Sequence, residues 1–94
     1  IIRNYMQITR IEVCLRYKKA FRRLSFELQK KRAIEKINIF RDNPFDPQLK
    51  THSLSGEHKE CWAFWISYGY RIEFIFLSDK EVLFLNTGTH DIYR

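Results

Sequence analysis

Three histidines, His52, His58 and His90, are the side chains of this 94-residue chain that exchange a proton near neutral pH without help from their surroundings. His90 is placed most suggestively, because it follows an apolar segment and Gly88 near the end of the chain. Catalytic groups commonly stand where a strand gives way to a loop. If the protein has an active site, we expect His90 to belong to it.

Arg71 is a fixed cation in an aromatic segment, between Tyr70 and Ile72. An arginine in such a place needs an anionic partner or a polar cleft. It could pair with Glu73, which lies two residues further on the same face of a strand. Alternatively, its planar fork could grip a phosphate and stabilise developing charge. The residues alone leave both interpretations open.

Together, His52, His90 and Arg71 could cleave RNA without a metal ion. One imidazole would take the 2′-hydroxyl proton, the other would protonate the leaving 5′-oxygen, and the guanidinium would hold the phosphorane. The alternative is that the histidines are exposed side chains with no catalytic role.

Cofactor chemistry is not expected. The chain has no Gly-rich phosphate loop, no Gly-x-Ser-x-Gly elbow, no Cys-x-x-Cys pair and no His-Glu-x-x-His motif. A zinc site of His52, His58 and Cys61 is conceivable, but its spacing matches no common pattern and a fourth ligand is not evident. We therefore expect no metal and no small-molecule cofactor.

The composition is that of one folded domain. Hydrophobic residues make up 45% of the chain and aromatic residues 16%, and no apolar run is long enough to cross a membrane. We expect a single domain over residues 6–94, with residues 1–5 as an N-terminal extension before a plausible start at Met6. Cys14 and Cys61 lie in apolar contexts, which favours free thiols in a reducing cytoplasm.

The net charge of +6 is concentrated in the first half, because residues 1–50 carry 13 Lys/Arg against 5 Asp/Glu. The remaining residues are slightly acidic. A solvated basic face would explain this, but such an excess also suits a polyanion such as nucleic acid. The candidate RNA-binding residues are Lys18, Lys19, Arg22, Arg23, Lys30, Lys31, Arg32 and Lys50.

Apolar spacing predicts a strand over Gln7–Leu15 and then two helices within residues 16–43. The first helix has an apolar stripe at i, i+3, i+4 and i+7, formed by Tyr17, Ala20, Phe21 and Leu24. The second runs from a Ser25 cap to about Asp42, because the residue before Pro44 disfavours helical backbone. We expect the two to form an antiparallel helical hairpin.

The C-terminal half reads as strands. Residues 62–68 and 70–77 alternate and predict a hairpin that turns at Tyr68-Gly69. A second turn at residues 78–80 leads into Glu81–Asn86, which is apolar on both sides and predicts a strand covered on both faces. The predicted fold is α+β in the order β-α-α-β-β-β, with about four mainly antiparallel strands and the helical hairpin on one face.

Several motifs carry a family resemblance. They are the run from Asn43 to Gly56, Trp62-Ala63-Phe64, Tyr70-Arg71-Ile72, Glu81-Val82-Leu83-Phe84-Leu85 and Gly88-Thr89-His90-Asp91-Ile92-Tyr93. In these the chain resembles the RelE/ParE superfamily of bacterial toxin-antitoxin toxins, and particularly its YafQ- and YoeB-like mRNA interferases. The resemblance implies a RelE-like fold, cleavage of mRNA in the ribosomal A site, and a cognate antitoxin that silences the toxin.

The resemblance also implies roles for individual residues. His52 stands where relatives carry a general base, Arg71 where YoeB-like members bind the phosphate, and His90 where they carry a catalytic histidine. Asp91 stands where YoeB-like members have tyrosine. His58 matches no role and is read as a surface residue.

Two alternatives to an mRNA interferase remain open. ParE-like members share the fold but inhibit DNA gyrase without catalysis, and they lack the set formed by His52, Arg71 and His90. An inactive, antitoxin-binding homologue is the other alternative, because Glu60 stands where many relatives have glycine.

Overall fold

The computed structural model of the protein describes residues 7–56 and 60–89. The predicted N-terminal extension, His58, His90 and Asp91 lie outside the described residues. The elements, in chain order, are β1 (Arg10–Val13), α1 (Leu15–Arg22), the π-helical η1 (Leu28–Ala33), α2 (Ile34–Asp42), the 3-10 helix η2 (Pro47–Leu49), β2 (His52–Ser53), β3 (Trp62–Ser67), β4 (Tyr70–Ser78) and β5 (Glu81–Gly88).

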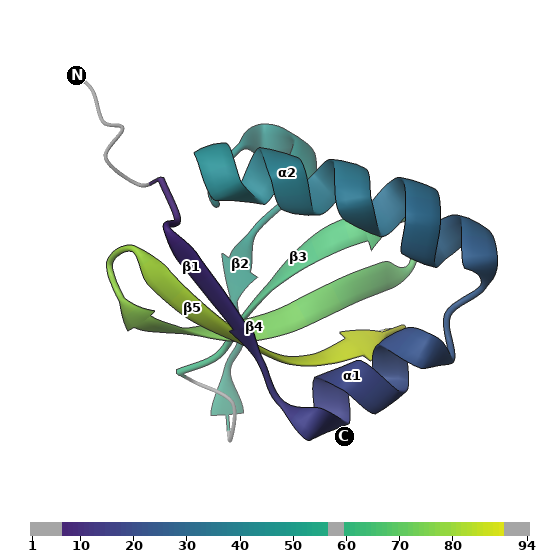
Figure 1. The fold of residues 1–94 in the computed structure, drawn as a ribbon. Helices are drawn as coiled ribbons and strands as arrows, with labels where there is room; N and C mark the ends of the chain where they lie inside the picture. Colours follow the sequence, from purple (N-terminus) through teal and green to yellow (C-terminus); the bar gives the residue numbers. More distant parts are fainter. Residues whose placement is uncertain (1–6, 57–59, 90–94) are drawn as a thin grey trace.

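The strands form one mixed sheet in the order β1-β5-β4-β3-β2 (Figure 1). β1 runs parallel to β5, and the other neighbours are antiparallel. The predicted α+β class is therefore confirmed, with five strands in place of about four. The additional strand is β2, whose two residues are too few to show alternation in a sequence.

The first strand is shorter than predicted, and the first helix starts earlier. The backbone of Cys14 is extended, with φ −94° and ψ 170°, and the helix begins at Leu15. Leu15 is 63% exposed and is helical, not part of a strand. The helix stripe itself is confirmed, because Tyr17, Ala20 and Leu24 are buried.

The second helix is bounded as predicted. The Ser25 hydroxyl accepts a hydrogen bond from the Leu28 amide at 3.3 Å, and Asn43 before Pro44 is extended. The π-helical stretch Leu28–Ala33 was not predicted. At its start, the Gln29 side-chain amide donates to carbonyls at the end of α1, including that of Phe21 at 3.0 Å.

Both helices cover the same face of the sheet, as predicted. α1 packs mainly on β5, whereas η1 and α2 pack on β3. The centre of the core is Phe40, whose ring lies 4.5 Å from that of Phe64 and 5.0 Å from that of Phe74. Burial of these rings against the sheet therefore helps to hold the helical layer in place.

β5 is buried on the helix-covered face but not on the other, which corrects the prediction for Glu81–Asn86. Val82 and Phe84 are buried, whereas Leu83 is half-buried. A β-bulge shifts the register, so that Phe74 lies opposite Phe84 but Glu73 lies opposite Asn86. The bulge gives the buried position to Thr87 and leaves Asn86 on the uncovered side.

Candidate active site on the open face of the sheet

The sheet face opposite the helices, here called the open face, carries polar residues from β2, β4 and β5. Cross-strand partners share a face of a sheet. The register places His52 opposite Ala63, Ala63 opposite Glu73, and Glu73 opposite Asn86. These four residues form one row across β2, β3, β4 and β5. Phe64 and Phe74, the chain neighbours of Ala63 and Glu73, point into the core.

The neighbouring row of the open face contains Arg71. It lies opposite Trp65 on β3 and Gly88 on β5. The structure therefore brings His52 and Arg71, which are 19 positions apart in the sequence, to the same sheet face in adjacent rows.

The His52 ring is held in one orientation by the backbone. Its Nδ1 lies 2.9 Å from the carbonyl oxygen of Lys50. A carbonyl only accepts, so Nδ1 carries the hydrogen in the neutral ring and Nε2 keeps its lone pair. The half-buried imidazole thus presents a basic nitrogen away from the backbone.

The turn before β2 explains why this carbonyl is in reach. Asp46 caps η2 through its carboxylate, which accepts from the Gln48 amide at 2.9 Å. Lys50 then adopts a left-handed backbone with φ 51°, which reverses the chain into β2. A non-glycine residue in this region carries strain, and such strain concentrates at functional sites.

Two cations lie against the Trp65 ring. The Arg71 guanidinium carbon is 5.5 Å from the ring centroid, and the Lys50 ammonium is 5.6 Å from it. They reach Trp65 from opposite neighbours of β3, since Arg71 is on β4 and Lys50 precedes β2. Lys50 therefore belongs with Arg71 on the open face, not with the cations of the helices.

Glu73 is a buried carboxylate within the site, with 3% of its surface exposed. It accepts a hydrogen bond from the thiol of Cys61, and burial, this bond and the charges of Glu73 and Glu60 raise the pKa of Cys61. The thiol is therefore neutral at physiological pH. Both Cys61 and Cys14 are free, as predicted. Glu73 shares the face of Arg71, so the ion-pair interpretation of Arg71 stays open beside the phosphate-binding one.

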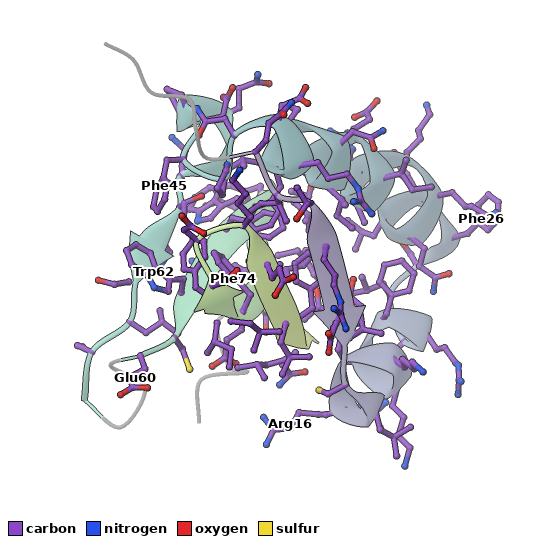
Figure 2. The ribbon with its side chains drawn as sticks, turned by 60° about the vertical axis from the view of Figure 1, so that its left-hand side comes forward. Arg16, Phe26, Phe45, Glu60, Trp62 and Phe74 are labelled. Atoms are coloured by element: carbon purple, nitrogen blue, oxygen red, sulfur yellow. The ribbon has the colours of Figure 1, made fainter. Side chains whose placement is uncertain are left out.

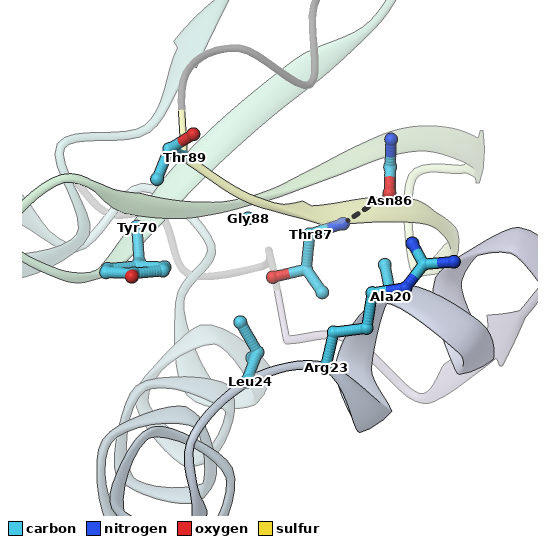
Figure 3. Close-up of a pocket in the computed structure, with 8 residues that line it drawn as sticks. All are labelled: Ala20, Arg23, Leu24, Tyr70, Asn86, Thr87, Gly88 and Thr89. Atoms are coloured by element: carbon cyan, nitrogen blue, oxygen red, sulfur yellow. Dashed lines mark hydrogen bonds between the residues drawn. The ribbon is translucent and has the colours of Figure 1, made fainter.

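The remaining predicted RNA-binding residues lie on the helical layer. We call them the basic helical surface, and all seven are exposed: Lys18, Lys19, Arg22, Arg23, Lys30, Lys31 and Arg32. A pocket of about 340 Å³ joins this surface to the end of β5 (Figure 3). Its lining includes Arg23 from the end of α1 together with Asn86, Gly88 and Thr89. Arg23 is therefore the member of the basic helical surface that reaches the end of β5.

The position of His90 relative to His52 and Arg71 stays a prediction, because the described part of β5 and its continuation ends at Thr89. Among residues 7–56 and 60–89, no three or more His, Cys, Asp or Glu side chains cluster as metal ligands would. His58, a member of the conceivable zinc set, is outside these ranges. None of the described helices has the length and apolar character needed to span a membrane.

Sequence reasoning missed Trp65 and Asn86 as members of the site. Alternation alone puts Trp65 on the face away from Phe64, and that signal was available. The position of Asn86 could not be found in this way, because the bulge in β5 reverses the alternation between Phe84 and Thr87.

No protein-family model matches the sequence, and no curated protein does. Solved structures do match. A YoeB/ParE toxin from Agrobacterium tumefaciens superposes with a TM-score of 0.72 at 15% identity, over 87% of this chain and 99% of that one. The E. coli DinJ-YafQ toxin-antitoxin complex matches with a TM-score of 0.67 at 22% identity, over 92% of this chain and 96% of that one. The archaeal RelE-RelB complex from Pyrococcus horikoshii matches with a TM-score of 0.66 at 18% identity, over 89% of this chain and 96% of that one. The chain therefore has the fold of the RelE, YoeB and YafQ toxins, which is the fold that the sequence resemblance implied.

Proposed function

We propose that this protein is the toxin of a type II toxin-antitoxin system and acts as an mRNA interferase, an endoribonuclease that cleaves mRNA on the ribosome. The observation that carries the proposal is the open face of the sheet. On it, a histidine with a fixed ring orientation and an arginine lie in adjacent rows of a fold shared with RelE, YoeB and YafQ toxins. The protein would act in the cytoplasm, where ribosomes are found.

The chemistry follows from the groups present. His52 Nε2 takes the proton of the 2′-hydroxyl, and the 2′-oxygen attacks the adjacent phosphorus. The Arg71 fork binds the non-bridging oxygens and stabilises the added negative charge. His90 gives a proton to the departing 5′-oxygen. The products are a 2′,3′-cyclic phosphate and a 5′-hydroxyl, and no metal or cofactor takes part.

The ribosome supplies what so small a site does not. The open face offers few groups that could read base edges, so correct placement of the substrate has to come from the ribosome that holds it. We assign the basic helical surface to contacts with the ribosomal RNA backbone. Such contacts release counterions, so ribosome affinity falls steeply with salt.

This assignment can be tested by charge reversal. Changing Lys18, Arg22 and Lys30 together to Glu should weaken ribosome binding and flatten its dependence on salt. Lys80→Glu, in the exposed turn before β5, is the matched control and should leave the salt dependence unchanged. If the triple variant and the control bind ribosomes with the same affinity and the same salt dependence, the basic helical surface does not contact ribosomal RNA.

A cognate antitoxin is the second proposed partner. The matched YafQ and RelE structures are complexes with DinJ and RelB. An acidic or amphipathic segment would complement the basic helical surface or the open face in charge. Co-expression of the adjacent small open reading frame should restore growth of cells that express this protein. If the protein expressed alone is harmless, the toxin proposal fails.

The experiment that tests the function itself is primer extension on translated mRNA in a reconstituted translation system. New 3′ ends within the mRNA are expected only when ribosomes are translating it. One matched structure is described as a YoeB/ParE toxin, so a gyrase supercoiling assay should run in parallel. Intact mRNA together with blocked supercoiling would assign the protein to the gyrase-inhibitor class.

A further inference from the structure

The β3–β4 hairpin carries two aromatic side chains beside the proposed site. Trp65 lies on the open face in the row of Arg71, and Tyr68 lies in the turn that follows β3. Their ring centroids are 6.3 Å apart with the ring planes at 79°. Tyr68 is 90% exposed, so its ring contributes almost nothing to the core.

We propose that Trp65 and Tyr68 form a binding site for an unpaired RNA base next to the cleaved phosphate. The inference rests on the proposed endonuclease function and extends it to a subsite. It is carried by the juxtaposition of the half-buried Trp65 and the exposed Tyr68 with the cations Lys50 and Arg71.

The two cations identify the kind of ligand. Both lie within 6 Å of the Trp65 ring centroid. An apolar protein segment that covered this ring would have to strip water from both charges, which is costly. Single-stranded RNA avoids that cost, because its phosphates replace the water while its bases offer flat surfaces for stacking. Sites for single-stranded nucleic acid combine the same two elements, a positive groove and aromatic platforms.

The position of the pair fits a base next to the reacting phosphate. Arg71 lies directly opposite Trp65 in the sheet, so a phosphate on Arg71 places its neighbouring nucleotide over Trp65 or Tyr68. Stacking does not discriminate strongly between bases, because every base has a π face. The subsite therefore strengthens binding and leaves the cleavage sequence permissive.

An exposed aromatic ring beside a lysine is not by itself a binding site, and the chain offers a matched control. Phe26, on the helical layer, is 75% exposed, and the Lys30 ammonium lies 6.0 Å from its ring centroid. Figure 2 shows Phe26 projecting outward at one end of the molecule. Removing its ring should have no effect on the proposed subsite.

The test measures binding of a short single-stranded RNA whose 2′-hydroxyls are methylated, so that it cannot be cleaved. Fluorescence is read in a Trp62→Phe background, in which Trp65 is the remaining tryptophan. Binding should quench Trp65. Tyr68→Ala should weaken affinity by roughly 5- to 150-fold, the range for loss of one stacked base, and Tyr68→Phe and Phe26→Ala should not.

The base itself is then removed to show that stacking is the cause. With an abasic nucleotide at the subsite, the affinity of the wild-type protein should fall by the same factor. Tyr68→Ala should then weaken binding of the abasic RNA no further. No quenching at any RNA concentration, or an equal effect of Tyr68→Ala on normal and abasic RNA, would overturn the inference. The proposed function fails separately, if ribosome-bound mRNA stays intact while RNA still quenches Trp65.

Discussion

Lys50 has a strained backbone conformation and, in the proposed site, a charge that binds phosphate, so substitutions there should separate stability from activity. Its left-handed backbone, with φ 51°, costs a non-glycine residue about 1–2 kcal/mol. Lys50→Gly removes that strain, but the unfolded chain gains freedom worth about 0.5–1 kcal/mol. The variant should therefore have a free energy of unfolding within about 1 kcal/mol of wild type.

Lys50→Ala loses the same charge but keeps the strain. It also loses the contact of the ammonium with Trp65, worth about 0.5–1 kcal/mol at an exposed site. Both variants lose that contact, so they differ by the strain less the cost of glycine's freedom, and we expect Lys50→Gly to be more stable than Lys50→Ala by about 0.5–1 kcal/mol. In a domain of this size, that difference separates their melting temperatures by about 2–8 °C, which circular dichroism resolves.

Activity should fall in both variants by a similar factor. Loss of one charged hydrogen bond to phosphate costs about 1.5–3 kcal/mol, or roughly 10- to 150-fold in the toxin concentration that gives half-maximal cleavage of ribosome-bound mRNA. Lys50→Arg should retain most of the activity. If Lys50→Gly cleaves as well as wild type, Lys50 does not contact phosphate. If the glycine and alanine variants have the same melting temperature, the strain assigned to Lys50 is wrong.

Three further predictions concern the core and its titrating groups. Phe40→Ala should lower the free energy of unfolding in urea by about 3–5 kcal/mol, since Phe40 is fully buried, and Phe45→Ala, 40% exposed, should cost less than half of this. Glu73→Gln should speed alkylation of Cys61 near pH 8, because Glu73 helps to raise the pKa of that thiol; an unchanged rate would contradict the pairing. Burial raises the pKa of Tyr17, so stability should fall as pH rises above about 10, where only the unfolded chain ionises, and Tyr17→Phe should lessen that fall.

Most of the fold could be read from the sequence, because its periodic elements are governed by local rules. The stripe from Tyr17 to Leu24, the Ser25 cap and the hairpin turn at Gly69 each follow from the types and spacing of a few residues. Gly69 indeed has a positive φ of 81°. The parallel pairing of β1 with β5 was not foreseen, since it joins residues about 70 positions apart.

The sequence was enough to name candidate residues for the proposed site, but not to say how these residues are arranged in space. His52 and Arg71 were found as candidates, yet their shared face depends on the register of β2, β3 and β4. Lys50 was named as an RNA-binding candidate without a place in the fold, because the sequence shows its charge but not where its side chain lies. Its left-handed backbone and its contact with Trp65 are properties of the folded turn, and they move it to the open face.

The most direct test of the account compares His52→Ala with Ser53→Ala in single-turnover cleavage of ribosome-bound mRNA. The two residues are adjacent in β2, but their side chains lie on opposite faces of the sheet. Loss of the general base should slow cleavage by about 10²- to 10⁴-fold in His52→Ala, and Ser53→Ala should cleave at nearly the wild-type rate. Equal rates in the two variants, with both folded by circular dichroism, would contradict catalysis on the open face.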